Sequence, residues 1–335
     1  MAVSEGLNSP EEINKREGVN VREEIESSQN LDSLNSAKVR QRFFDLDLLP
    51  DSLKSEGLNS ESWAIASAFI AYAAGDAFGA AHEFVSNPPE KIHSILLGKP
   101  DWPYGGVSDD TTLSLLTIES LIEANPEAAA SKYLDLLRNS QESLRGLGPT
   151  TRFALGMSVK EEEQHFIGVS NGGMMRTALL GTAFSSCESE LREAWVKASV
   201  ESTHKNPIAV SAALSLSSLF SDALTLGAQM VNPALPSDWS PPKKGISLDP
   251  MESYQAVIYV ASQATSVEDA FLRACELGGD TDTVAALSGS LVAASMRERS
   301  GLFEIPWLMD VNWSEIPQMK NAIDLLTIRR SKWVK

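Results

Sequence analysis

Apolar residues in this chain recur at the spacing of an α-helix from Ser62 almost to the C-terminus, and few segments alternate as β-strands do. The first such segment places Trp63, Ala66 and Ile70 along one helical face. This periodicity predicts an all-α fold. The expected helices cover residues 113–124, 126–137, 190–202, 208–226, 251–262, 267–277 and 283–296.

Length and charge limit the size of the fold and the class of partner. With 335 residues, 43% of them hydrophobic, the chain can bury a sizeable core in one large domain or two ordinary ones. Its 45 acidic and 28 basic residues give a formal charge of -17, which repels phosphate backbones and anionic lipid surfaces. We therefore expect neither nucleic acid nor a membrane as a partner. A basic protein substrate and solubility alone both remain explanations of the acidic surface.

The cysteine content and the N-terminus indicate a cytoplasmic protein. Cys187 and Cys275 are the two cysteines, which argues against a disulfide scaffold and fits a reducing compartment. Residues 1–9 contain no basic stretch followed by an apolar one, and we expect no segment apolar enough to span a membrane.

The N-terminal part of the chain differs from the rest. Residues 1–60 are rich in Glu, Asn, Ser and Lys and predict an arm, whereas residues 61–335 predict the helical domain. Within the arm, residues 39–53 carry enough apolar side chains for a short docking helix or lid. Two interpretations stay open: a partly disordered leader that packs on its own domain, and a partner-binding arm. The polar, proline-rich residues 231–250 predict an exposed excursion.

A first acidic cluster, Ser108-Asp109-Asp110-Thr111, lies where Gly105 and Gly106 precede a predicted helix. One aspartate here is explained by helix capping, which needs only one carboxylate. Two adjacent carboxylates and the Ser108 hydroxyl instead offer several hard oxygen ligands in one turn. Mg²⁺ and Mn²⁺ prefer such ligands.

A second acidic cluster has the same design, because Gly278 and Gly279 precede Asp280-Thr281-Asp282-Thr283 at a helix start. Small residues on that helix let another helix approach closely, so the two clusters can converge. Four carboxylates without cations would repel and raise one another's pKa values, and two divalent ions are the natural compensation. Zinc is not expected, because the four histidines show no paired ligand spacing and no Cys-x-x-Cys is present.

Three further features complete the set. In Gly75-Asp76-Ala77-Phe78-Gly79, Asp76 is either a structural carboxylate or a functional one, and the nearby Glu83 is in range of a metal or its water. The glycines of Ser170-Asn171-Gly172-Gly173-Met174-Met175-Arg176 can expose backbone N–H groups to a diphosphate. Its Arg176 is expected to bind either a neighbouring carboxylate or the ligand. Thr203-His204 precedes a predicted helix and suits a cap and a supporting donor.

These five motifs, in this order, resemble those of the ADP-ribosylglycohydrolase family, over residues 62–297. The resemblance implies an all-α orthogonal bundle of many helices with a binuclear centre of two Mg²⁺ or Mn²⁺ ions. The implied metal ligands are Ser108, Asp109, Asp110, Asp280, Asp282 and Thr283. The implied catalytic residues are Glu83, Asp110 and Asp282. The implied substrate contacts are Ser170, Asn171, Gly172, Gly173, Met174 and His204.

Two positions depart from the family pattern. The first metal motif begins with Ser108 where many relatives have threonine, and a hydroxyl is kept. The glycine loop carries Met174-Met175 where an Ala-Met pair is usual, which leaves the fine substrate preference open. Non-catalytic use of the fold is disfavoured, because all six ligand positions carry compatible residues.

The resemblance implies hydrolysis of the bond between ADP-ribose and a protein side chain, arginine first, which reverses mono-ADP-ribosylation. The expected partners are an ADP-ribosylated protein or ADP-ribose itself. An alternative from another class is an immunity or binding protein that neutralises an ADP-ribosyltransferase through residues 1–60, with or without hydrolysis.

Overall fold

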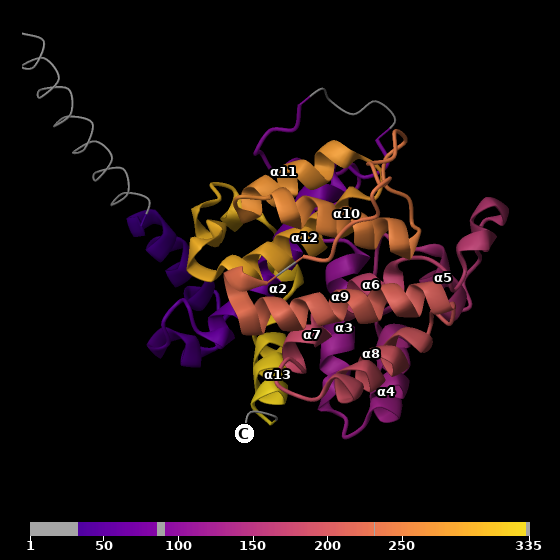
Figure 1. Ribbon diagram of the computed structural model, residues 1–335, viewed down its shortest axis with the longest axis horizontal. Helices are drawn as coiled ribbons and strands as arrows, with labels where there is room; N and C mark the ends of the chain where they lie inside the picture. Colours follow the sequence, from indigo (N-terminus) through magenta and orange to yellow (C-terminus); the bar gives the residue numbers. More distant parts are fainter. Residues whose placement is uncertain (1–32, 86–90, 231, 333–335) are drawn as a thin grey trace, which may run out of the picture.

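Two buried helices, α2 (Glu61–Ala80) and α12 (Thr281–Met296), pack against each other at the centre of the computed structural model (Figure 1). The structure describes residues 33–85, 91–230 and 232–332. The two helices run in opposite directions, with Gly79 against Asp282 and Gly75 against Ala285. A Cβ atom at Gly79 would lie 2.5 Å from the Cα atom of Asp282. The small side chains therefore permit the close approach that the sequence predicted.

The helices expected from apolar spacing are all present, and their ends differ by a few residues from the prediction. Besides α12, they are α3 (Asp109–Glu119), α4 (Pro126–Ser140), α8 (Ser189–Glu201), α9 (Pro207–Leu226), α10 (Pro250–Gln263) and α11 (Val267–Leu277). Figure 1 shows α10 and α11 on one side of the central pair and α4 and α8 at the opposite end. The all-α prediction is confirmed, since the described residues contain no β-strand.

Other helices were not predicted. They are α5 (Pro149–Ala154), α6 (Gly172–Thr177), α7 (Leu180–Ala183) and α13 (Met319–Ser331). The 3-10 helices are η1 (Asp51–Ser55), η2 (Ser120–Ile122), η3 (Glu161–Phe166), η4 (Gly227–Gln229), η5 (Arg297–Ser300), η6 (Leu302–Glu304), η7 (Leu308–Asp310) and η8 (Trp313–Glu315). Helices α5, α6 and α7 are too short to display an apolar period.

The described part of the predicted arm packs on the helical domain. Residues 33–45 are helical, and the Phe43 ring lies edge-on to Trp313 with centroids 4.9 Å apart. Leu49 and Leu53 are also buried in the main core. Residues 1–32 lie outside the described part of the chain, so the division into an arm and a domain stays a prediction.

The predicted excursion is largely exposed, but its end holds the second acidic cluster in place. Ile246 is buried and forms a bridge with Gly279. Its backbone N–H donates to the Gly278 carbonyl, and its carbonyl accepts from the N–H of Asp280, each at 2.9 Å. Gly279 has a φ of 78°, and a Cβ there would lie 2.0 Å from the Ile246 carbonyl oxygen. Only glycine fits this turn.

Two segments are long and apolar enough to cross a membrane by length and composition, contrary to our expectation of none. They are α2 and residues Pro207–Gln229, which join α9 to η4. The apolar windows are 100% and 61% buried inside the protein, respectively. Core helices of soluble proteins pass the same test, so the finding is weak evidence for a membrane span.

Candidate functional site

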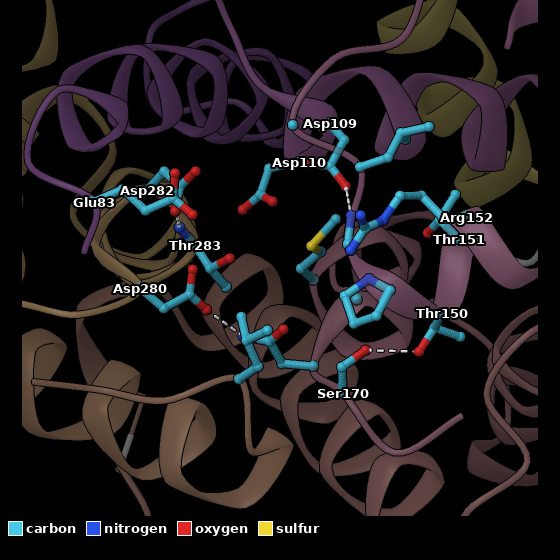
Figure 2. Close-up of a pocket in the computed structure, with 18 of the residues that line it drawn as sticks. Glu83, Asp109, Asp110, Thr150, Thr151, Arg152, Ser170, Asp280, Asp282 and Thr283 are labelled. Atoms are coloured by element: carbon cyan, nitrogen blue, oxygen red, sulfur yellow. Dashed lines mark hydrogen bonds between the residues drawn. The ribbon is translucent and has the colours of Figure 1, made fainter. Parts of the chain in front are cut away.

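A cavity opens where α2, α3 and α12 bring their polar ends together (Figure 2). Glu83 follows α2, Asp109 and Asp110 begin α3, and Asp282 begins α12. The opposite wall is formed by the glycine loop and by α5. The two acidic clusters, about 170 residues apart in the sequence, therefore line one cavity, as their design predicted.

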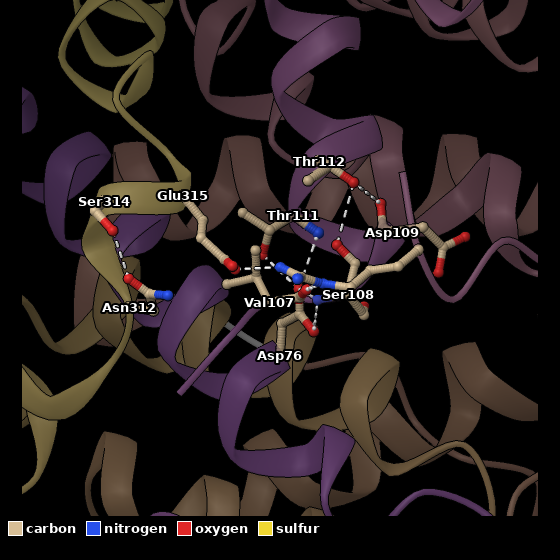
Figure 3. A network of polar contacts seen from close by, with 10 residues as sticks. Asp76, Val107, Ser108, Asp109, Thr111, Thr112, Asn312, Ser314 and Glu315 are labelled. Carbon is tan, nitrogen blue, oxygen red and sulfur yellow. Dashed lines mark hydrogen bonds and ion pairs between the residues drawn. The ribbon is translucent and has the colours of Figure 1, made fainter. Parts of the chain in front are cut away.

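Asp76 positions the first acidic cluster (Figure 3). It is fully buried on α2, and its carboxylate accepts from the backbone N–H groups of Ser108 and Thr111 at 3.0 Å. The Thr111 hydroxyl donates to the same carboxylate at 2.6 Å. Burial raises the pKa of Asp76, while these donors lower it. Of the two roles left open for Asp76, the structure shows the structural one.

Ser108 is the N-cap of α3, because its Oγ accepts from the backbone N–H of Asp110 at 3.0 Å. Neither aspartate is used as the cap. Asp109 Oδ2 accepts a long bond of 3.4 Å from the N–H of Gly148, and Asp110 Oδ2 is buried without a partner among the described residues. Burial raises the pKa of both carboxyls well above the usual value, and the charge of Asp76 adds to the effect.

The second acidic cluster is anchored by Thr281, whose hydroxyl donates to the Gly79 carbonyl at 2.8 Å. Asp280 accepts a hydrogen bond from the Asn171 amide across the cavity. Burial, followed by the charge of Glu83, raises the pKa of Asp280 to about 6. The same two causes raise the pKa of Asp282 well above its usual value.

The acidic residues fit a divalent cation. Oxygen atoms of Glu83, Asp280 and Asp282 lie within 4.8 Å of one another, and no histidine or cysteine belongs to this described group. The unpartnered oxygen of Asp110 needs a cation or a donor, because a buried carboxylate without one is costly. An all-oxygen set suits Mg²⁺ or Mn²⁺ better than zinc.

The predicted metal ligands differ in whether they line the cavity. Thr283 and the four aspartates line the cavity, but Ser108 does not, because its hydroxyl turns back to cap α3. Glu83 already has a cationic partner, since the Lys99 ammonium lies 2.6 Å from its Oε2. This contact was not predicted, because residues 91–103 carry no recognisable motif.

The glycine loop lies across the cavity from the acidic clusters. Ser170, Asn171 and Gly172 line the cavity as predicted, whereas Gly173 and Met174 do not. Successive residues of a helix point about 100° apart, so on α6 Met175 faces the cavity and Met174 is buried in the core. Gly173 and Met174 therefore lie behind the wall of the cavity, and substrate contacts at these two residues stay a prediction.

Gly173 instead gives His204 room, because a Cβ atom there would lie 3.0 Å from the imidazole Cγ. His204 lines the cavity, and its Nε2 lies 3.1 Å from the Ser170 hydroxyl. Burial and then the charge of Arg176 lower the pKa of His204 to about 3, so the ring is neutral. The cap predicted at Thr203-His204 is wrong, since Asn206 Oδ1 accepts from the N–H of Ile208.

Arg176 fills neither of its two expected roles. Its side chain is 1% exposed, lies over the Tyr133 ring at 4.0 Å and does not line the cavity. It donates to Ser199 and Thr203, and among the described residues it bonds no carboxylate. The arginine fixes α6 against α8, which supports the glycine loop from behind.

Several lining residues were missed in the sequence. They are Phe84, residues 146–152, Glu163, Met175 and Leu248. Most of them belong to α5 and to loops, where no pair of carboxylates marks a site, and the glycines at 146 and 148 were not recognised as part of one. Thr150 illustrates their use, because its hydroxyl lies 3.0 Å from that of Ser170 and so joins α5 to the glycine loop.

Comparison with known proteins agrees with this geometry. The sequence model of the ADP-ribosylglycohydrolase family matches residues 63–240 and 242–332. A solved structure described as an ADP-ribosylglycohydrolase-related protein complex is similar, with a TM-score of 0.61 and 25% sequence identity. The similarity covers 81% of this chain and 99% of that chain. No curated protein sequence matches significantly.

Proposed function

The chain belongs to the ADP-ribosylglycohydrolase family, as its motifs predicted, and we propose that it is a metal-dependent hydrolase that removes ADP-ribose from modified protein side chains. Arginine is the proposed attachment residue. The observation that carries the proposal is the convergence of both acidic clusters on one cavity, with the glycine loop on the facing wall. We further propose that the protein acts in the cytoplasm.

The proposed metal ligands are the residues of the two acidic clusters. They are Asp109, Asp110, Asp280, Asp282 and Thr283, and Ser108 supports them as the cap of α3. Two Mg²⁺ or Mn²⁺ ions held there would supply Lewis acidity and would lower the pKa of a water molecule at the site. Deprotonated carboxylates are required for this, and without a cation burial first, and then the charges of neighbouring carboxylates, raise the pKa values of Asp110 and Asp282.

The protein's own groups perform the remaining tasks. We assign the orientation of a water molecule and the acceptance of its proton to Glu83, Asp110 and Asp282, which all line the cavity. Positive charge that develops at the anomeric carbon of the ribose is stabilised by the acidic wall. On the facing wall, the neutral His204 and Thr150 fix the Ser170 hydroxyl at the mouth of the glycine loop.

The proposal is tested by measuring ADP-ribose release from an arginine-modified protein with Mg²⁺ and with a chelator. We expect activity to require the metal, and Asp282→Asn to lower kcat at least about 100-fold, as for loss of a catalytic group. Asp135→Asn is the control, because that carboxylate is 65% exposed on α4. Full activity in chelator would refute the metal mechanism.

The attachment residue needs a separate assay. A panel of arginine-, serine- and nucleic-acid-linked ADP-ribose conjugates, tested with Mg²⁺ and Mn²⁺, should show the arginine conjugate cleaved fastest. Faster cleavage of another conjugate would leave the hydrolase proposal intact and replace the arginine assignment.

A further inference from the structure

Arg152 is the one lysine or arginine among the described residues that line the cavity. It lies on α5, across the cavity from Glu83 and Asp282 (Figure 2). All other charged side chains on the cavity wall are carboxylates, because His204 is neutral. The cavity therefore has an acidic end that suits cations and a facing wall with a single fixed guanidinium.

The guanidinium is held in place but not saturated. Its Nη2 donates to Glu163 Oε2 at 2.5 Å, and Glu163 comes from η3 on the same wall. Its Nε is buried and has no hydrogen-bond partner in the described part of the chain. Other arginines, such as Arg176 and Arg192, also have a buried unpartnered Nε, but they lie away from the cavity. Arg152 thus brings unused N–H capacity to the wall of the cavity.

This division of charge matches the chemistry of an ADP-ribosyl group. The ribose whose anomeric carbon reacts is uncharged and rich in hydroxyls, and it is joined through its C5 carbon to an anionic diphosphate. A planar guanidinium binds phosphate oxygens through parallel N–H bonds, better than a point charge does. The carboxylates around the acidic end exclude the diphosphate from that end by like-charge repulsion.

We propose that Arg152 is a specificity-determining residue that binds the diphosphate of the ADP-ribosyl group and directs the ribose to the acidic end. The assignment rests on the function proposed above and adds a side-chain contact on α5 to the backbone N–H groups of the glycine loop. Glu163 holds the guanidinium toward the cavity and competes with the diphosphate for one of its N–H groups.

A purely structural role for Arg152 makes a different prediction. In that case Arg152 and Glu163 would only tie α5 to η3, and removal of either side chain would have the same effect. If Arg152 binds the diphosphate, Arg152→Gln removes the contact, whereas Glu163→Gln removes a competitor and keeps it. The two variants therefore separate ligand binding from support of the wall.

The test is calorimetric titration of ADP-ribose into the full chain with Mg²⁺ present, at low and at high NaCl. We expect Arg152→Gln to weaken binding about 10- to 100-fold, Arg152→Lys to fall between it and wild type, and Glu163→Gln to bind as tightly as wild type or more so. High salt should weaken wild-type binding and affect Arg152→Gln much less, because the variant has lost a charge contact. Melting temperatures check that each variant is folded.

Three outcomes would overturn the assignment. Wild-type affinity in Arg152→Gln, or equal weakening in Arg152→Gln and Glu163→Gln, would refute it and leave the proposed function standing. Failure of wild type to bind ADP-ribose at all would count against the proposed function itself, and the assignment would fall with it.

Discussion

Single residues around Glu83 decide how readily its carboxylate meets a cation. Lys99 pairs with Glu83 at 2.6 Å, and its ammonium also lies 4.2 Å from the centre of the Trp102 ring. Both side chains of the pair are about a quarter exposed, so the pair is only partly screened by water. A divalent ion that binds Glu83 must therefore compete with a charge that belongs to the chain.

Removing that competitor should strengthen metal binding. We expect Lys99→Met to bind Mn²⁺ more tightly than wild type, by up to about fivefold, since such a pair contributes ~0.2–1 kcal/mol. Calorimetry measures the change, and Lys54→Met is the control because the Lys54–Asp51 pair is exposed at the surface. Unchanged or weaker binding by Lys99→Met would show that Lys99 does not compete.

His204 makes a pH-dependent contribution to stability whose sign follows from its lowered pKa. Burial lowers that pKa from 6.5 to about 3, so between these values the unfolded chain binds a proton that the folded chain does not. The contribution of His204 to stability is therefore complete above about pH 6.5 and is lost as the pH falls. The buried carboxyls of the cavity, whose pKa values are raised, act in the opposite direction.

Because the two effects oppose each other, the test compares wild type with His204→Gln. The difference in free energy of unfolding, measured in urea, should shrink as the pH falls from about 7 to 4, by at most ~1.4 kcal/mol per pH unit. A difference that does not depend on pH would show that folding does not shift the pKa of His204.

Helices α2 and α12 contribute to the core along their length and to the site at their ends. The Gly79 backbone touches the start of α12, where Asp282 begins the second acidic cluster. We expect Gly79→Ala to destabilise the protein by about 1–3 kcal/mol and to weaken Mn²⁺ binding, because the helices must move apart. Gly57→Ala is a matched control, since a Cβ there meets nothing within 4 Å. Thermal unfolding and Mn²⁺ titration measure the two effects. Equal losses of stability and of Mn²⁺ affinity in Gly79→Ala and Gly57→Ala would refute the close-contact explanation.

The helix over residues 33–45 packs on the core, so a deletion that tests the N-terminal part of the chain must leave this helix in place. Deleting residues 1–60 would remove Phe43 and Leu49 from the core and so confuse loss of partner binding with unfolding. We expect deletion of residues 1–32 to leave the melting temperature and ADP-ribose release unchanged, because the described residues from 33 onward form the core and line the cavity. If hydrolysis falls with the fold intact, those residues take part in catalysis.

The elements also show what the sequence could predict and why. Helix α9 could be recognised because its apolar period is long, whereas its cap, Asn206, was not recognised. The acidic clusters were found because each follows glycines at the start of such a helix. Arg152 and Glu163 were missed because α5 and η3 have six residues each, too few to show a period, and only the tertiary fold brings them to the cavity.

Over the whole molecule, metal binding and stability should be coupled. Several carboxylates are buried close together, so a bound divalent ion relieves repulsion that the folded state otherwise carries. At about 100 times its dissociation constant, Mg²⁺ or Mn²⁺ should raise the free energy of unfolding by ~2.7 kcal/mol.

Thermal unfolding with and without metal measures this coupling. Asp282→Asn should melt at a higher temperature than wild type in chelator, because one repelling charge is gone, and should gain little from added metal. Asp135→Asn should behave as wild type in both conditions. A wild-type melting temperature that neither Mg²⁺ nor Mn²⁺ changes would contradict the coupling.

The hydrogen bond from Thr281 to the Gly79 carbonyl joins residues 202 positions apart, and it has a consequence for the order of events during translation. The first acidic cluster leaves the ribosome long before α12 is made. A nascent chain therefore exposes Asp109 and Asp110 with no partner cluster, and it gains a complete site only when α12, which begins at Thr281 of the 335 residues, has emerged. Truncated products of this gene will carry the glycine loop and half of the acidic residues, and they will be inactive for lack of α12.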